Sequence, residues 1–490
     1  VGGFTRTSAG PTSVWDVTGA SSVNGSTHTI TGNNFSNINL TGASDFTGFR
    51  DWDGNTSSGP TKTITGNTIT GITTGAGVVA PLSVDNAGAS STVSNNVMMN
   101  ITSTITTGTL PILFLGAGSQ AGLVCSGNTI AGINSAIPFL YGLQSNAGNA
   151  TISKNRIYDL TTSSATSSGW VAAIQALTKT SSTVTIANNL IGNLTAPAST
   201  SPKGMIGINL AGSSTTSAWN VYYNTIHLNA PTSGVGFGSS GILAVGSTTP
   251  TTARLDLRNN IVVNTSVQGG TGLTVAFRRE LSGAGTLANY ASTSNNNLFY
   301  AGTPSASNLI YADGTDVAQS LYEYKNGVFV AGTVAPRDAA SVTGVPPFLS
   351  TVGANADFLH IDPSVPTLIE SGAAPLAGVT DDVDGNARNG STPDIGADEF
   401  TGTPGCMPPT ANPPAVANAG CSTYDITVTI ISTSGSPGGV VDIQVDGNTV
   451  ATQGVGGPYN LGTYVNGTTH SGSPRCTSET LCDNFLGSIT

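Results

Sequence analysis

The chain has 490 residues, of which 38% are hydrophobic and only 8% are charged, and its formal net charge is −11. An average domain carries about 25% charged residues, so this surface must be solvated largely by Ser, Thr, Asn and Gly. The 15 Lys and Arg residues are spread thinly, which argues against a surface for nucleic acid or anionic membrane. The sequence contains no apolar run long enough for a transmembrane helix.

The first 25 residues match none of the repeats that follow them. A stack of β-strands exposes apolar side chains and unpaired strand edges at its end. We therefore predict that residues 1–25 form an N-terminal cap. Residue 1 is Val and no secretion leader pattern follows it, so we expect a mature or excised chain.

Nine copies of a nine-residue pattern occupy residues 26–300. The pattern reads apolar, two residues, Asn, one residue, apolar, two residues, apolar, and Ile64–Ile72 is a clear copy. Successive asparagines lie 27 to 37 residues apart, a period typical of solenoids and other repeat architectures. The asparagines of the nine copies are Asn33, Asn67, Asn96, Asn128, Asn155, Asn189, Asn224, Asn260 and Asn297.

Each copy is predicted to form two short strands that meet at a bend. Tracts such as Thr183–Ile186 alternate as half-buried strands do, and no helical spacing of apolar residues is present. We place the Asn at the bend, because Asn adopts the left-handed backbone conformation more readily than most residues. Stacked coils would align these side chains in a ladder of amide hydrogen bonds. The sequence therefore predicts an all-β chain built on a parallel β-helix with its apolar residues inward.

The last copies depart from the pattern. Asn224 is followed by Ile226 and then by Leu228, one position early, and Asn260 has Thr265 at its last apolar position. Asn297 has Ser in place of its first apolar residue. We expect bulged or closing coils here. Cys125 stands at an apolar position of the fourth copy and is predicted to be a small buried side chain rather than a nucleophile.

The repeats resemble the right-handed parallel β-helix family, the pectate-lyase-like solenoids, over roughly residues 25–300. The resemblance implies enzymes that cut polysaccharides, and such enzymes need clustered carboxylates and usually an Arg or Lys base. Between residues 60 and 250, however, the only carboxylates are Asp85 and Asp159.

Basic residues offer little more for catalysis. Lys154 and Arg156 share one repeat with Asp159, and a solvated ion pair is the simplest interpretation of this group. Arg278 and Arg279 precede Glu280, and we interpret them as a surface ion pair. The four histidines, His28, His227, His360 and His470, lack metal-ligand spacing.

Residues 301–402 lose the Asn period and are predicted to be closing coils and a C-terminal cap. They end in Asp381–Arg388 and Pro393–Phe400, which resemble the closing signature of secreted bacterial β-helix proteins. The resemblance implies a structural role, in which Arg388 pairs with Asp394 or Glu399 and locks the last coil. The matching residues are Asp382, Gly385, Arg388, Asp394, Ile395, Gly396, Ala397 and Glu399.

The carboxylates from Asp313 to Asp398 are the best remaining place for a catalytic or binding site. Those that could converge are Asp313, Asp316, Glu323 and Asp338. Two tracts, Asp51–Asn55 and Asp382–Asn386, resemble the start of a calcium loop. Neither has a Glu at the twelfth position, where Lys62 and Pro393 stand. Tight turns explain them more simply, and structural calcium stays the alternative.

A Pro-rich linker, residues 403–415, leads to a module at 416–490 with alternating strand tracts. The module resembles the Ig-like or fibronectin-III-like modules of large Bacteroidota surface proteins, which implies that further modules and a type IX secretion signal follow. Four cysteines suit disulfides in an exported module, with three connectivities open. They are Cys406, Cys421, Cys476 and Cys482.

The preferred hypothesis is a non-catalytic extracellular or cell-surface protein, a rigid rod for display, self-assembly or glycan contact. It predicts no catalytic residues, cofactor-binding residues or metal ligands, and partners limited to other copies of the chain or carbohydrate, without nucleic acid or membrane insertion. The alternative is a polysaccharide lyase or glycoside hydrolase of the pectate-lyase-like class. Ice binding through Thr arrays is a third hypothesis, disfavoured because the repeat length varies.

Overall fold

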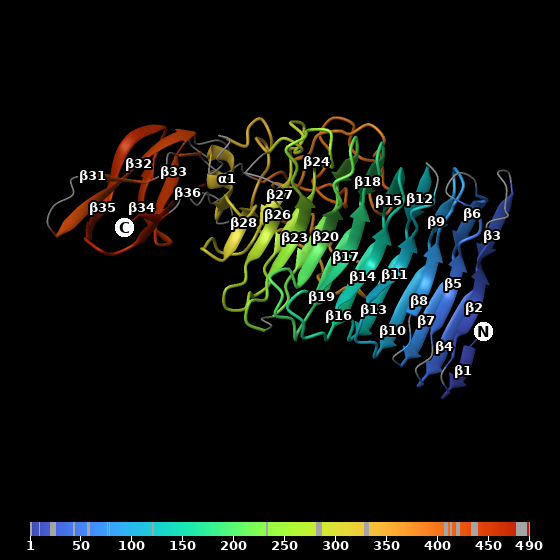
Figure 1. Cartoon of the computed structure of the whole chain (residues 1–490). Helices are drawn as coiled ribbons and strands as arrows, with labels where there is room; N and C mark the ends of the chain where they lie inside the picture. Colours follow the sequence, from blue (N-terminus) through green and yellow to red (C-terminus); the bar gives the residue numbers. More distant parts are fainter. Residues whose placement is uncertain are drawn as a thin grey trace.

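The computed structural model describes residues 2–8, 10–19, 26–42, 45–55, 59–75, 77, 79–119, 122–231, 234–280, 287–327, 333–405, 410–411, 414–417, 422–432, 440–476 and 488–489. These residues form a rod of stacked coils followed by a small β module (Figure 1). The only helix among them is α1 (Leu321–Asn326). The predicted all-β parallel solenoid is therefore confirmed.

Three parallel sheets, here called A, B and C, run along the rod. Each full coil adds one strand to sheet C, then one to A, then one to B. Sheet A contains β1 (Gly2–Arg6), β4 (Asn34–Leu40), β7 (Thr68–Thr74), β10 (Val97–Ser103), β13 (Thr129–Ser135), β16 (Arg156–Thr162), β19 (Leu190–Thr195), β22 (Thr225–Leu228), β25 (Ile261–Asn264) and β27 (Leu298–Tyr300).

Sheet B contains β2 (Thr12–Val17), β5 (Phe46–Asp51), β8 (Val79–Val84), β11 (Thr109–Leu115), β14 (Phe139–Ser145), β17 (Trp170–Leu177), β20 (Met205–Ala211), β23 (Ser239–Val245), β26 (Thr274–Glu280), β28 (Asn308–Ala312) and the antiparallel β29 (Val317–Ala318). Sheet C contains β3 (Thr27–Thr31), β6 (Thr61–Thr65), β9 (Thr92–Ser94), β12 (Leu123–Ser126), β15 (Ala150–Ser153), β18 (Thr183–Ala187), β21 (Ala218–Tyr222) and β24 (Arg254–Arg258).

The nine asparagines form one continuous ladder at the corner between sheets C and A. The Oδ1 atom of Asn67 accepts from the backbone N and the Nδ2 of Asn33, at 3.1 and 2.9 Å, and the same pair of bonds recurs at every step to Asn297. Asn33 is exposed and the other eight are buried. The predicted ladder is confirmed.

The left-handed backbone conformation, however, belongs to the residue before each ladder Asn. Every one of these nine residues has a positive φ between 53° and 66°. The ladder Asn itself is thus free to point inward and bond along the stack. The nine residues are Gly32, Gly66, Asn95, Gly127, Lys154, Asn188, Tyr223, Asn259 and Asn296.

A second left-handed residue, four positions after the ladder Asn, interrupts the sheet A strand in six coils. It is skipped in the pairing register of β10 with β13, where Asn100 has no partner. This insertion shifts the alternation by one residue, which explains why the inward apolar positions lie two and five residues after the Asn. These residues are Asn37, Gly71, Asn100, Gly132, Asp159 and Asn193.

The coil that begins at Asn224 lacks this insertion, so Leu228 points inward one position early. The expectation of bulges in the departing copies was wrong, because the left-handed insertion belongs to the regular copies. The alternative expectation of closing coils fits the copy at Asn297, which leads into β27, the last strand of sheet A.

The two ends of the rod have different structures. At the N-terminal end, residues 2–19 supply β1 and β2, which extend sheets A and B, and Phe4 and Trp15 are each 43% exposed. At the other end, β28, β29 and α1 follow the last coils. Ser320 and Glu323 form a capping box at the start of α1.

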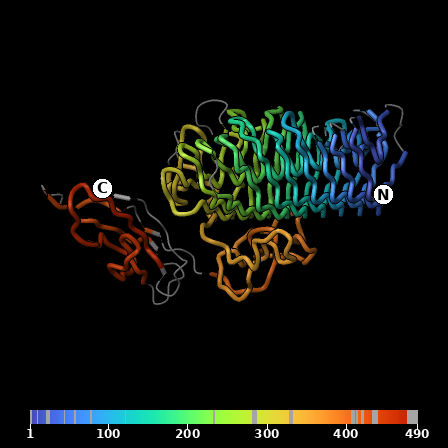
Figure 2. The backbone as a smooth tube through the Cα atoms, turned by 90° about the horizontal axis from the view of Figure 1, so that it is seen from below, coloured from blue at the N-terminus to red at the C-terminus, as the bar shows by residue number. Residues whose placement is uncertain are grey.

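Residues 343–405, here called the apron, do not continue the coils. They contain isolated bridges but no strand or helix. Figure 2 shows them in orange as a separate layer beside the later coils of the rod. The closing coils predicted for residues 301–402 are thus confined to the part before the apron.

The C-terminal module consists of two antiparallel sheets around a small core that includes Tyr424, Ile426 and Ile443. Its strands are β30 (Thr410–Ala411), β31 (Ala415–Ala417), β32 (Thr423–Ser432), β33 (Val441–Val445), β34 (Asn448–Gln453), β35 (Gly456–Val465), β36 (His470–Cys476) and β37 (Ser488–Ile489). The predicted disulfides lie outside the described residues or side chains: Cys406, Cys421, Cys476 and Cys482.

Candidate functional site

The apron covers the outer face of sheet A along the later coils. Outward positions of this sheet are the first and third residues after each ladder Asn. In β4 and β7 they are polar and at least partly exposed: Asn34, Ser36, Thr68 and Thr70. In the later strands several of them are apolar and buried: Leu190, Ile261, Val263 and Leu298. This change from polar to apolar is the sequence signal that would have revealed the covered face.

Apolar side chains of the apron pack directly on this face. Phe358 and Leu359 are fully buried, and the ring of Phe358 lies 5.4 Å from that of Tyr158. A Cβ atom on Gly192 would lie 2.9 Å from the Cζ atom of Phe358, so the missing side chain makes room for the ring. A second cluster joins Ile395 of the apron to sheet A.

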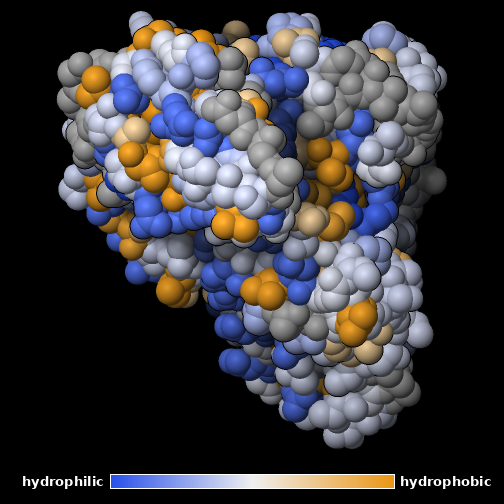
Figure 3. Space-filling model, turned by 90° about the vertical axis from the view of Figure 1, so that its left-hand side faces the viewer, coloured by the Kyte–Doolittle hydropathy of each residue, from blue (hydrophilic) through white to orange (hydrophobic). Residues whose placement is uncertain are grey.

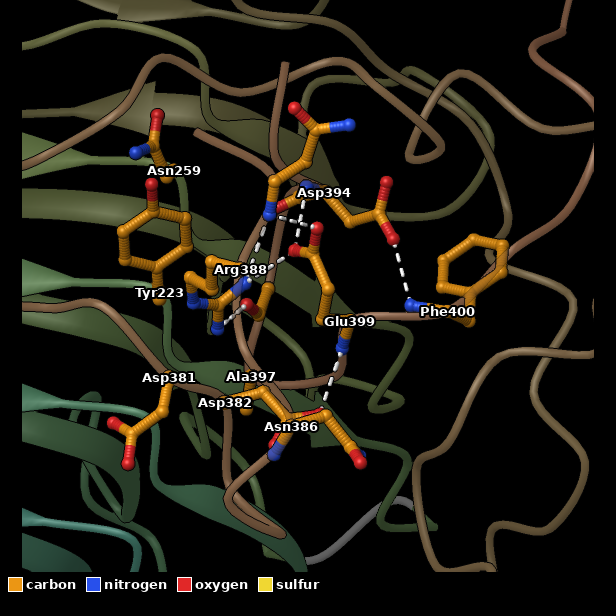
Figure 4. Close-up of polar contacts among 12 residues, drawn as sticks. Tyr223, Asn259, Asp381, Asp382, Asn386, Arg388, Asp394, Ala397, Glu399 and Phe400 are labelled. Atoms are coloured by element: carbon orange, nitrogen blue, oxygen red, sulfur yellow. Dashed lines mark hydrogen bonds and ion pairs between the residues drawn. The ribbon is translucent and has the colours of Figure 1, made fainter. Parts of the chain in front are cut away.

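Arg388 is the central polar contact of the apron (Figure 4). Its Nη1 lies 3.1 Å from Oε2 of Glu399, and its Nη2 donates to Oδ1 of Asn188 at 2.8 Å and to the carbonyl of Gly396 at 2.9 Å. The guanidinium also lies 3.8 Å from the ring centroid of Tyr223. Of the two predicted partners, Glu399 forms the ion pair. The anchor is on coils within the rod, so the prediction that this signature locks the last coil was wrong.

Asp394, the other predicted partner of Arg388, binds backbone N–H groups instead of forming an ion pair. Its carboxylate accepts from the backbone N of Ser371 at 2.7 Å and of Phe400 at 2.8 Å. Burial raises the pKa of Asp394 to about 7, despite these two hydrogen bonds. Asp382 likewise accepts from the backbone N of Asp384 and Asn386, so the second calcium-like tract is a tight turn, as predicted.

Lys154 and Arg156 also hold the apron. The Nζ of Lys154 lies 2.6 Å from Oδ2 of Asp381, and Arg156 donates to the carbonyls of Asn355 and Ala356 at 2.8 and 3.1 Å. The expected solvated pair with Asp159 is thus replaced by contacts to distant chain. A pocket of about 320 Å³ remains beside this contact, and its only charged lining residues are Lys154 and Asp381.

In the first calcium-like tract, Asp51–Asn55, the ammonium group of Lys62 lies among oxygen atoms that could otherwise bind a cation. Lys62 is fully buried, and its Nζ contacts the carbonyls of Asp51, Asp53 and Asp85 and Oδ1 of Asp51, at 2.6 to 3.0 Å. His28 lies 2.8 Å from the other oxygen of Asp51. Burial lowers the pKa of Lys62, and the hydrogen bond to Asp51 opposes that shift. The oxygens suited to calcium are therefore occupied by the chain itself.

The acidic residues before the apron serve local structure. Asp313 accepts from the hydroxyl of Tyr311 and from the backbone N of Asp316, and Glu323 caps α1. Asp338 is fully buried and accepts from Tyr290, Tyr324, Ser341 and Nδ2 of Asn297. The Asn ladder thus ends at Asp338, whose carboxylate accepts the last Nδ2 hydrogen bond in place of another Asn. The predicted convergence of these carboxylates is not found in the described residues.

One group in the described part of the chain has the composition of a metal site. Ligand atoms of His360, Asp384 and Asp398 lie within 4.8 Å of one another. Each already has a protein partner, since His360 Nε2 lies 2.6 Å from Asp384 and Asp398 accepts from the backbone N of Ile361. The hydrogen bond to Asp384 raises the pKa of His360. These residues could bind a divalent cation only by exchanging those contacts.

The interpretation of Arg278, Arg279 and Glu280 as one surface ion pair was wrong. Alternation along β26 turns Arg279 into the core, where it is 1% exposed and donates to Asn289. Glu280 pairs instead with Lys203. Cys125 is fully buried as predicted, and burial raises the pKa of its thiol.

No protein-family model matches the sequence, and neither a curated protein nor a solved structure shows significant similarity to it. Among the described residues, no helix has the length and apolar character needed to cross a membrane.

Proposed function

We propose that the protein is a non-catalytic extracellular structural or adhesive surface protein, a rigid rod for display, self-assembly or glycan contact. The proposal rests on one observation: acidic side chains in the apron and before it bind other groups of the protein. In the apron, Asp394 and Asp382 accept backbone N–H groups. Three further carboxylates of the apron pair with Arg388, Lys154 and His360. In the preceding segment, Asp338 accepts from the hydroxyls of Tyr290 and Tyr324. Carboxylates engaged in this way support a fold rather than a reaction.

A polysaccharide lyase or glycoside hydrolase of the pectate-lyase-like class is the alternative. Such chemistry requires two carboxylates, or a carboxylate and a base, that face a substrate across an open groove. The later part of the outer face of sheet A is packed beneath the apron, and Asp394 and Glu399 belong to the apron itself. This packing favours the structural role.

The extracellular location rests on the resemblance to secreted bacterial surface proteins, including the type IX secretion of Bacteroidota proteins, and on the charge-poor composition. Self-association is supported by Phe4 and Trp15, whose side chains are partly exposed on the first coil. On the face seen from the end with the module, Figure 3 shows hydrophobic residues scattered among hydrophilic ones.

The test is a turnover assay on a panel of neutral and acidic polysaccharides. New reducing ends report hydrolysis, and absorbance of unsaturated products reports lyase cleavage. We expect neither to exceed the heat-denatured control, while pull-down with insoluble polysaccharides reports contact without cleavage. Product that increases in proportion to protein and time would favour the enzyme instead.

A further inference from the structure

The outer face of sheet B carries a pocket that none of the contacts above explains. It has a volume of about 680 Å³ and lies at β26 and the turn between β28 and β29. Its charged lining residues are Lys203, Arg278, Arg279, Glu280 and Asp313. Arg279 points into the core, so Lys203 and Arg278 are the two cationic side chains available to this pocket, in a protein with a net charge of −11.

The two acidic residues of this pocket are already engaged. Glu280 pairs with Lys203, and Asp313 accepts from the hydroxyl of Tyr311 and from backbone N–H groups of the turn at Thr315 and Asp316. Neither contact supplies a counter-ion to Arg278.

Arg278 is a cation for which the described residues supply no counter-ion. Its Nη1 lies 3.4 Å from the carbonyl of Pro202, while its buried Nε and Nη2 have no hydrogen-bond partner in the described part of the chain. Buried charged donors without acceptors are costly. Burial lowers the pKa of Arg278 to about 10, so the guanidinium stays charged at neutral pH. Burial and then the charge of Arg278 lower the pKa of Lys203, a repulsion that a bound anion would relieve.

The same face offers contacts for a sugar chain. Gln144, Gln175 and Asn209 follow one another in register, and the same row continues through the buried Leu243 to Arg278. Phe139 and Trp170 lie five residues before Gln144 and Gln175 on β14 and β17, with ring centroids 4.7 Å apart, and both are partly exposed. Strands lie about 4.8 Å apart, so Gln175 and Arg278 are separated by roughly 14 Å. Amides suit hydroxyl groups and aromatic faces suit the apolar faces of sugar rings.

We propose that this pocket binds one carboxylate or sulfate group of an anionic glycan that runs along the outer face of sheet B. Arg278 and Lys203 bind the anion, and the amide row contacts the neutral part of the chain. The proposal deepens the glycan contact proposed above and rests on it.

The experiment compares hexuronate, sulfated and neutral oligosaccharides as ligands of the whole chain by isothermal titration calorimetry. We expect at least tenfold tighter binding of an anionic ligand than of the neutral one, weakening with added salt. The two anionic arms decide between carboxylate and sulfate. R278Q should reduce this affinity at least tenfold. The matched control is R50Q, because Arg50 lies on the same row but pairs with Asp16 at 2.5 Å, and it should leave the affinity unchanged.

E280Q is the second variant, in case R278Q does not fold. It frees Lys203 from its ion pair and should strengthen binding of the anionic ligand severalfold. Equal binding of neutral and anionic ligands, or equal effects of R278Q and R50Q, would overturn the proposal. Reducing ends are measured in the same samples, so that cleavage, which would refute the non-catalytic function, is distinguished from a failure to bind.

Discussion

Each ladder asparagine makes contacts that no other side chain reproduces. The Oδ1 of Asn155 accepts from the backbone N and Nδ2 of Asn128, while its own Nδ2 donates to Oδ1 of Asn189 and to the carbonyl of Cys125. Asp lacks the donor, and Gln places the amide one carbon farther out. The ladder therefore fixes the register of the coils through short, directional bonds in a buried corner.

The ladder predicts a position-dependent cost of mutation. Asn155→Ala leaves buried donors and acceptors unpaired and should lower the free energy of unfolding by about 3 kcal/mol. Asn33→Ala is the control, because Asn33 is exposed at the first step, and it should cost about 0.5 kcal/mol. Urea unfolding followed by the fluorescence of the buried Trp219 measures both. Equal losses would refute a stabilising role for the buried steps.

Asp394 predicts a pH dependence of the apron. Its folded pKa of about 7 exceeds its ordinary value of 3.8, so the folded state binds the proton more tightly. This contribution to stability is complete below pH 4 and is lost as the pH rises through 7. His360, whose pKa is also raised, acts in the same direction. Burial lowers the pKa of His227 to about 4, so its contribution is lost as the pH falls below 6.5.

Hydrogen exchange between pH 6.5 and 8 excludes a contribution from His227, which stays neutral there, and comparison with Asp394→Asn separates the effect of Asp394 from that of His360. After correction for intrinsic rates, the amides of Ser371 and Phe400 should lose protection as the pH rises. Asp394→Asn should flatten this dependence. An unchanged slope in the variant would assign the effect to another group.

At the scale of elements, the apron is held by contacts of very different burial. Arg388 is 3% exposed in its pair with Glu399, whereas Lys154 and Asp381 are 25% and 46% exposed. A buried pair that loses one partner leaves an uncompensated charge, whereas an exposed pair is screened by water. The signature that resembles a closing motif is thus the main anchor of the apron.

Arg388→Ala should destabilise apron docking by about 3–5 kcal/mol, and Lys154→Ala by less than about 1 kcal/mol. Hydrogen exchange of the apron amides reports the docking, and the coil strands serve as an internal reference. Comparable loss of protection in the two variants would show that the buried anchor is not dominant.

The left-handed position in the sheet A strands predicts that substitutions at Gly132 and Asp159 differ in their cost to stability. Gly132 has φ 63°, and a Cβ there would lie 2.7 Å from Oδ1 of Asn100. Gly132→Ala should therefore cost about 1–2 kcal/mol. Asp159→Gly, at the equivalent position of the next coil, should change stability by less than about 0.5 kcal/mol. Thermal unfolding of the two variants checks the difference.

At the scale of the whole molecule, the rod was predictable and the apron was not. The Asn period is local and repeats, so the coils and the ladder follow from the sequence. The apron depends on contacts such as Asn188 with Arg388, 200 residues apart, and its own sequence has no period. Lys62 shows the same limit, since the spacing of acidic residues does not reveal that a lysine occupies the space between them.

The apron covers the later part of the outer face of sheet A, and this packing supports the proposed non-catalytic role. Zero-length carbodiimide cross-linking tests this packing, because Lys154 and Asp381 lie 2.6 Å apart but 227 residues apart in sequence. Mass spectrometry of the monomer should identify a Lys154–Asp381 link, together with Lys203–Glu280 as the positive control. The control link without the Lys154–Asp381 link would contradict this packing.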